Sequence, residues 1–159
     1  MDDVNTFLIE WFIRFLENKD VVRKNIVSID PNKNGFDLVV NYKDKTVNFI
    51  LQVNLEITIL EKINKNGHFG LIVLNNVENL RFVYLNWKKL AEIMFLRLYF
   101  INPFSQKDKV WTLFPHIHDS ICDKSSLETG LKSMSEMVEP VMGEEIRQKV
   151  KSGKEVSDL

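Results

Sequence analysis

The sequence predicts one α/β domain built on a single mixed β-sheet with helices on its faces. Segments with helical periodicity bracket the predicted strands, which is typical of a sheet covered by helices. The 159 residues match the commonest size of one domain, and 45% apolar and 11% aromatic residues suffice to fill one core. We expect this domain to span residues 1–143, followed by a polar, frayed C-terminal tail at 144–159.

The N-terminal half predicts one helix followed by an antiparallel meander. Leu8, Phe12 and Phe15 repeat at helical spacing, so a helix is expected over residues 4–18. β-Branched and aromatic segments separated by Pro, Asn and Gly predict the elements that follow, which are a strand at 21–29, a turn at 30–35 and a hairpin of strands 36–42 and 46–56.

The C-terminal half predicts two more strands and two long helices. Residues 57–65 are expected to form a short helix, although Ile57, Thr58 and Ile59 also suit an extension of the preceding strand. The remaining expected elements, in chain order, are strands at 68–74 and 80–85, a helix at 87–101, a loop at 102–125 and a helix at 127–141.

Charge and cysteine content narrow the functional classes. The chain has 21 Lys and Arg against 22 Asp and Glu, so any binding of nucleic acid must come from a local patch rather than from overall charge. Cys122 is the single cysteine, and no secretory signal opens the sequence, which favours a reducing cytoplasm. The longest apolar stretches contain charged residues, so we expect no membrane-spanning segment.

Three segments carry a resemblance to a known superfamily. They are Leu8-Ile9-Glu10-Trp11 on the first helix, Gly35-Phe36-Asp37-Leu38-Val39-Val40 on the second strand, and Ile50-Leu51-Gln52-Val53-Asn54 on the third. This arrangement resembles the core of the PD-(D/E)xK nuclease superfamily, and the resemblance covers residues 4–98. It implies a restriction-endonuclease-like core of order α-β-β-β-α-β-β with a mostly helical C-terminal tail.

The resemblance implies a metal site for phosphodiester hydrolysis. Asp37 matches the metal-binding aspartate, Gln52 stands where an Asp or Glu belongs, and Glu10 matches the acid on the first helix. These three side chains would hold Mg²⁺ or Mn²⁺. Asn54 stands where the catalytic Lys belongs, and an amide brings no positive charge. The resemblance therefore implies a degenerate site that binds DNA or acts weakly on it.

Other residues are candidates to complete the site. Lys62 on the next helix would replace the missing cation, and Glu56 would supply a second carboxylate, although it lies about 13 Å along an extended strand from Gln52. A basic rim around the site is expected from Lys43, Lys45, Lys62, Lys65, Arg81, Lys88 and Lys89.

Two readings from other classes stay open. In the first, the same scaffold is a non-catalytic protein-interaction or assembly module, in which Gln52 and Asn54 are structural and an apolar patch binds a protein partner. In the second, His116, His118 and Cys122 form the site of a different enzyme. If the nuclease-like reading holds, the oxygens of Glu10, Asp37 and Gln52 gather at one point.

Overall fold

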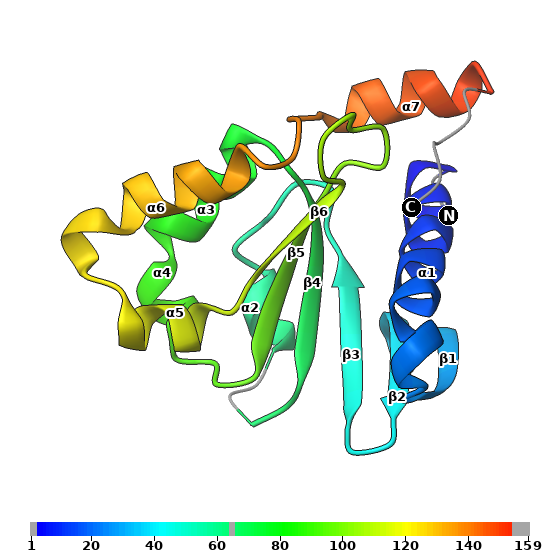
Figure 1. The fold of residues 1–159 in the computed structure, drawn as a ribbon, viewed down its shortest axis with the longest axis horizontal. Coiled ribbons are helices and arrows are strands. Elements are labelled where there is room, and N and C mark those ends of the chain that lie inside the picture. Colours follow the sequence, from blue (N-terminus) through cyan, green and yellow to red (C-terminus); the bar gives the residue numbers. More distant parts are fainter. Residues whose placement is uncertain (1–2, 64–65, 154–159) are drawn as a thin grey trace.

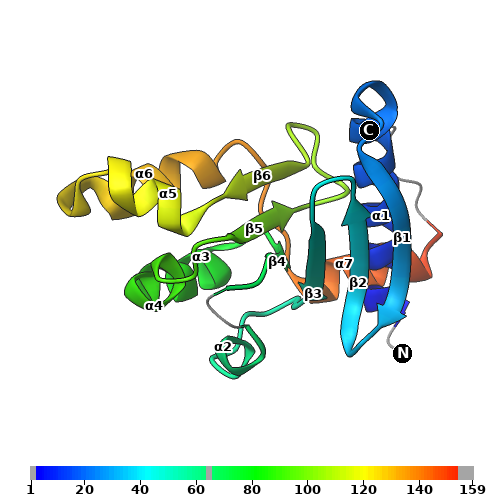
Figure 2. The same ribbon diagram turned by 90° about the horizontal axis from the view of Figure 1, so that it is seen from below.

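The structure is a computed structural model that describes residues 3–63 and 66–153 (Figure 1). Six strands form one mixed sheet in the sequential order β1-β2-β3-β4-β5-β6, and Figure 2 shows them following one another across the molecule. The strands are β1 (Ile26–Lys33), β2 (Phe36–Tyr42), β3 (Thr46–Leu51), β4 (Phe69–Leu74), β5 (Leu96–Ile101) and β6 (Val110–Leu113). The predicted fold class, α/β with a single mixed sheet, is confirmed.

Strand direction divides the sheet into two parts. β1, β2 and β3 form an antiparallel meander, β3, β4 and β5 run parallel, and β6 returns antiparallel to β5. Parallel neighbours require crossover connections, and helices lie in both of them. The helices are α1 (Asp3–Arg23), α2 (Ile59–Lys62), α3 (Val77–Leu85), α4 (Trp87–Ala91), α5 (Pro115–Ile121), the 3-10 helix η1 (Lys124–Ser126), α6 (Leu127–Ser135) and α7 (Gly143–Lys151).

α1 is longer than its apolar stripe predicts. The expected helix ends at residue 18, whereas α1 continues to Arg23. The next residue, Lys24, has a positive φ of 50° and terminates the helix. The Asp20 carboxylate then accepts hydrogen bonds from the backbone N–H groups of Asn25 and Ile26. Because of this turn, β1 begins only at Ile26. Residues 21–23, which were expected to open the strand, are helical instead.

The β1–β2 hairpin is tighter than the sequence suggests. Lys33 pairs with Phe36, which leaves Asn34 and Gly35 as a two-residue loop with φ values of 54° and 80°. Positive φ at both positions is the geometry for which Asn-Gly is preferred. The predicted turn at 30–35 therefore shrinks, and Asp30 and Pro31 belong to β1.

Three assignments in the second half are wrong. Residues 80–85 belong to α3, because the Asn76 side chain caps that helix by accepting a hydrogen bond from the Asn79 N–H. The expected helix at 87–101 stops at Ala91 and is followed by β5. The expected loop at 102–125 contains β6 and α5.

The sheet separates two hydrophobic cores. α1 and α7 cover one face, whereas α2, α3, α4 and α6 cover the other, as Figure 1 shows for the helices on each side. Leu38, Phe49 and Ile72 point into the core on the side of α1 and α7, which we call the α1 core. Ile50, Leu71 and Leu98 occupy the alternate strand positions and point into the core on the other side, which we call the α6 core. Gly70 lies where an added Cβ would come within 2.5 Å of Phe49 Cε1, so only glycine fits beside that buried ring.

The predicted frayed tail is partly ordered. Residues 143–151 form α7, whose Ile146 is fully buried in the α1 core, so the boundary expected at residue 143 does not mark the end of the folded chain. Residues 154–159 of the expected tail lie outside the described residues. Within the described part of the chain, no helix is long and apolar enough to cross a membrane.

Candidate functional site

Asp37 lies where β2 and β3 part. The last backbone pair between these strands joins Leu38 and Phe49. Beyond it, the N–H of Leu51 donates to Asp37 Oδ2 at 2.8 Å, so the carboxylate takes the place of a strand carbonyl. Asp37 is half-buried, and one of its oxygens is already used by the fold.

Gln52 follows β3 directly and lies near Asp37, because its chain neighbour Leu51 bonds the Asp37 carboxylate. Its backbone N–H continues the parallel ladder to the Ile72 carbonyl at 2.9 Å. Its side-chain oxygen accepts a hydrogen bond from the Glu56 N–H at 3.1 Å and thereby closes the turn after β3. The amide oxygen that the resemblance assigns to a metal therefore has a structural partner.

Glu10 does not close over Asp37 and Gln52. Its neighbours Ile9 and Trp11 are buried, whereas Glu10 is exposed on the side of α1 away from the sheet. Moreover, α1 packs on the face that receives Leu38, and strand alternation directs Asp37 to the opposite face. The expected convergence of three oxygen ligands is therefore wrong.

Asn54 and the two replacement candidates are also poorly placed. The expected strand 46–56 ends at Leu51, so exposed Asn54 lies in a loop. Glu56 and Lys62 are exposed as well. Among the described residues, no group of three or more His, Cys, Asp or Glu side chains could hold a metal ion. One engaged carboxylate beside one engaged amide does not fit the oxygen-rich ligand set that Mg²⁺ or Mn²⁺ needs.

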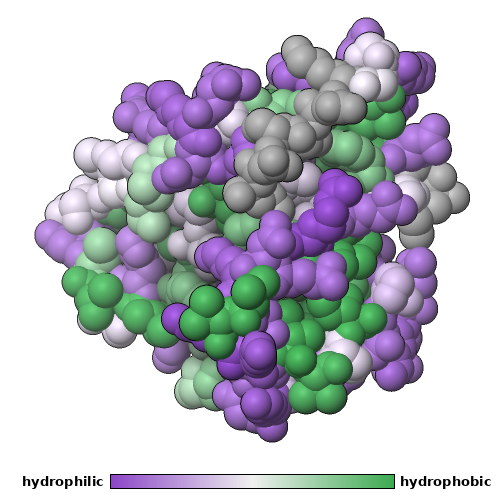
Figure 3. All heavy atoms as spheres, turned by 45° about the vertical axis from the view of Figure 1, so that its right-hand side comes forward, coloured by the Kyte–Doolittle hydropathy of each residue, from purple (hydrophilic) through white to green (hydrophobic). Residues whose placement is uncertain are grey.

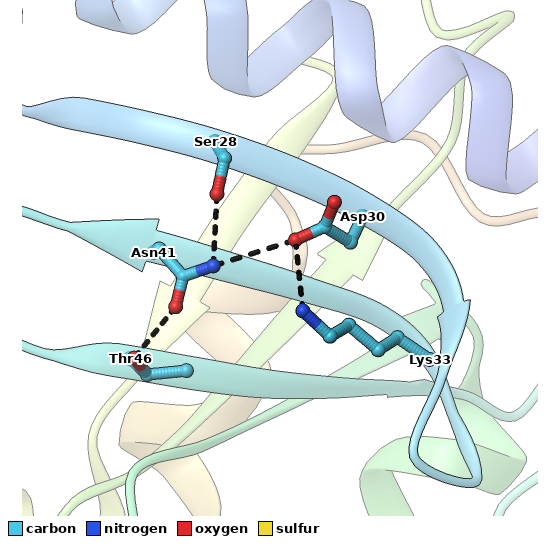
Figure 4. Close-up of polar contacts among 5 residues, drawn as sticks. All are labelled: Ser28, Asp30, Lys33, Asn41 and Thr46. Atoms are coloured by element: carbon cyan, nitrogen blue, oxygen red, sulfur yellow. Dashed lines mark hydrogen bonds and ion pairs between the residues drawn. The ribbon is translucent and has the colours of Figure 1, made fainter.

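The open face of the meander is polar but internally satisfied (Figure 4). Asn41 Nδ2 donates to Ser28 Oγ at 2.8 Å and to Asp30 Oδ2 at 3.4 Å, while Thr46 Oγ1 donates to Asn41 Oδ1 at 2.8 Å. Lys33 forms an ion pair with Asp30 at 3.6 Å. This cluster connects the neighbouring strands β1, β2 and β3 through their side chains. The polar residues on this face of the meander therefore have partners within the sheet and need no ligand.

The histidine and cysteine candidates have separate surroundings on α5 and after it. His116 Nδ1 lies 2.8 Å from the Ala91 carbonyl, and His118 packs edge-on against Trp87. Trp87 donates its indole N–H to Asp119 at 2.9 Å. Cys122 is half-buried after the end of α5. These contacts attach α5 to α4 rather than assembling a reactive group.

A group of buried asparagines lies outside the residues that the sequence singles out as candidates. Asn75 follows β4 and donates to the carbonyls of Ser135 and Val138, while its oxygen accepts from the Trp111 indole. Asn102 follows β5 and donates to the Glu139 carbonyl. Both therefore fasten the segment after α6 to the carboxyl ends of parallel strands.

Asn76 and Asn79 extend this group. Asn76 donates to the Val141 carbonyl, and Asn79 donates to the carbonyls of Val53 and Leu74 and accepts from the Leu55 N–H. Asn75 and Asn102 stand directly after apolar strands, which is the available signal, because buried backbone groups at strand ends need partners.

A groove of about 930 Å³ lies between α3 and α6 at the same end of the sheet. Apolar side chains dominate its wall, and Val77 and Leu85 on α3 are 75% and 67% exposed. Arg81 from the predicted basic rim also lines this groove, whereas Lys65 of that rim lies outside the described residues.

A second hollow, the α1–β6 cleft, separates the C-terminal half of α1 from β5 and β6. It comprises two cavities of about 640 and 620 Å³ that share Phe15, Lys19 and Thr112. Its lining residues are Phe15, Leu16, Asn18, Lys19, Asp20, Arg23, Asn25, Ile26, Tyr42, Lys45, Arg97, Tyr99, Ser105, Gln106, Lys107, Asp108, Lys109, Val110, Thr112 and Phe114. Figure 3, which turns the α1 side of the molecule forward, shows hydrophobic and hydrophilic side chains interspersed on this face.

Two tyrosines, half-buried Tyr42 and buried Tyr99, meet the cations at one end of the α1–β6 cleft. The pKa of Tyr42 is raised to about 12, chiefly by burial and to a smaller extent by the neighbouring Tyr99 and Asp20, while Arg97 opposes the rise. Tyr42 therefore stays protonated and is a neutral hydrogen-bonding wall of the cleft.

Comparison of the chain with known protein families, curated proteins and solved structures gives no match.

Proposed function

We propose that the chain is a DNA-binding domain of nuclease-like architecture with a degenerate metal site. The observation that carries the proposal is the charge of the α1–β6 cleft. The cavity of about 620 Å³, which we call the inner half of this cleft, is lined by Lys19, Arg23, Lys45 and Arg97. Asp20 is the one acid among the described residues that line this half, and its carboxylate is bonded to the backbone after α1.

These cations are available to a polyanion. Among the described ion pairs, none joins a carboxylate to Lys19, Arg23 or Arg97, whereas Lys45 pairs with exposed Asp44 at 3.4 Å. Clustered basic side chains bind phosphates by releasing condensed counterions, so a local patch suffices even in a chain of net charge −1.

The proposal includes binding without efficient catalysis. Asp37 and Gln52 use oxygens for backbone hydrogen bonds, and Glu10 points away from both. We therefore expect supercoiled plasmid to stay intact in the presence of Mn²⁺. Cleavage that grows with protein concentration and disappears in Asp37→Asn would show instead that the site is active.

Binding is tested by fluorescence anisotropy with labelled DNA over a salt series. The double variant Lys19→Gln/Arg23→Gln removes two exposed cations from the cleft and should weaken binding at least about tenfold at low salt. Lys88→Gln/Lys89→Gln is the matched control, because it removes two exposed cations from α4, which packs on the other face of the sheet. Equal losses in both variants would contradict binding in the cleft.

The α3–α6 groove favours a second candidate function, a protein-interaction module. Exposed Val77 and Leu85 on one wall are an unusual display of large apolar side chains on a surface helix. If copies of the chain associate through this groove, light scattering should detect a dimer that Leu85→Glu dissociates. A monomer at every concentration would contradict self-association.

A further inference from the structure

The dimensions of the α1–β6 cleft select the form of nucleic acid that enters it. Each cavity, of about 640 or 620 Å³, falls in the range of about 300–1,000 Å³ that is typical of small-ligand sites. A duplex is broader than its own major groove, which already measures about 12 Å, so it would lie across such a space rather than enter it. Because the two cavities share lining residues, they form one elongated path along α1 that suits a single strand.

Aromatic rings alternate with cations along this path. The Arg97 guanidinium lies 5.6 Å from the centre of the Phe114 ring, and Lys19 Nζ lies 4.9 Å from the centre of the Phe15 ring. Lys45 Nζ lies 5.2 Å from the Tyr42 ring. Phe114 is 40% exposed, which leaves ring surface accessible for a base. Sites that bind single strands combine cations for the phosphates with rings for the bases.

Arg97 is suited to a phosphate on the sheet side of the cleft. Its Nε is buried and has no hydrogen-bond partner among the described residues, and its Nη1 makes only a long contact of 3.5 Å to the Tyr99 hydroxyl. A guanidinium with unused donors binds phosphate oxygens in a fork, which a lysine cannot do. Exposed Lys19 and Arg23, one turn apart on α1, face it from the helix side.

We propose that the α1–β6 cleft binds single-stranded DNA, with phosphates on Arg97, Lys19 and Arg23 and a base stacked on Phe114. This inference rests on the proposed DNA-binding function and adds its substrate class. The cleft lies on the face of the sheet that carries Arg97 and Tyr99, opposite the face of Asp37, so the binding is independent of the degenerate metal site.

The experiment compares a labelled oligothymidylate of about 12 nucleotides, within the usual span of about 4–16 nucleotides, with a duplex of the same length. The single strand should bind at least about tenfold more tightly than the duplex at low salt. Phe114→Leu should weaken single-strand binding about fivefold or more while leaving the salt dependence unchanged, because it removes a ring and no charge. Phe95→Leu is the matched control, since Phe95 is 43% exposed but stacks on His68 outside the cleft lining.

The outcomes separate the two proposals. Equal binding of duplex and single strand, or equal effects of Phe114→Leu and Phe95→Leu, would overturn the single-strand inference and leave the DNA-binding function standing. Stronger binding of an oligouridylate would overturn the choice of DNA. Absence of binding to every probe at low salt would overturn the proposed function itself.

Discussion

The Asp37 carboxylate completes the hydrogen bonding of the sheet where two strands separate. Its bond to the Leu51 N–H predicts that Asp37→Ala lowers the free energy of unfolding by about 1–3 kcal/mol, because a backbone donor loses its acceptor. Asp37→Asn should lose less, since its amide oxygen still accepts a hydrogen bond. Urea unfolding of both variants measures the difference. A full-sized loss in Asp37→Asn would show that the negative charge matters more than the acceptor.

His68 makes the stability depend on pH. Burial lowers the pKa of His68 from its ordinary 6.5, and Arg97 and Lys45 lower it further against the opposing charge of Asp44. The unfolded chain therefore binds a proton that the folded chain resists, so this contribution to stability is complete above pH 6.5 and is lost as the pH falls below it. We expect His68→Gln to reduce the drop in Tm between about pH 7.5 and 5.5. An unchanged drop would assign the pH dependence to other groups.

Single residues also show how far the sequence predicts the site. The strand positions of Asp37 and the closeness of Gln52 follow from the hairpin pattern. The outward direction of Glu10 depends on which face of α1 meets the sheet. The hydrogen bonds accepted by the side-chain oxygens of Asp37 and Gln52 depend on where β2 and β3 part. Arg97 was missed because the apolar spacing of residues 87–101 suits a helix, and a helix would not place it beside Phe114.

At the scale of elements, Asn79 joins α3, the end of β4 and the loop after β3. Asn79→Ala removes its three bonds to Val53, Leu74 and Leu55 and should lower the free energy of unfolding by about 3 kcal/mol or more. Asn86→Ala is the control, because that side chain makes one bond, to the Phe82 carbonyl of the helix that Asn86 follows, and should cost about 1 kcal/mol. Thermal and urea unfolding test both. Similar losses would show that the network does not connect these elements.

Local pattern and tertiary packing compete in the elements that the sequence misassigned. Residues 80–85 are rich in β-branched and aromatic side chains, yet the Asn76 cap and the inward spacing of Val83, Trp87 and Leu90 favour helix once the β4–β5 crossover needs cover. The three strands of the meander and their order were predicted, although their bounds moved, because turn residues such as Asn34-Gly35 are a local signal. β5 was not, since its strand identity depends on pairing with β4.

At the scale of the whole molecule, one sheet supports both cores. Leu38 and Phe49 on one face alternate with Ile50 on the other, so the same strands carry side chains of each core. α7 contributes Ile146 to the α1 core, and α6 contributes Leu131 to the α6 core. Neither core can lose its packing without disturbing the strands that the other one needs, which favours cooperative unfolding of the described chain.

The last prediction follows from this shared sheet. Ile146→Ala and Leu131→Ala each create a cavity and should each lower the free energy of unfolding by about 2–5 kcal/mol. Because the cores are coupled, both variants should shift one and the same transition, seen alike by circular dichroism and by fluorescence of Trp11 in one core and of Trp87 and Trp111 in the other. Calorimetry of the wild type and the two variants provides the measurement. Two resolved transitions, one moved by Ile146→Ala and the other by Leu131→Ala, would contradict a single cooperative unit and would make α1, α7 and the meander a separate folding unit.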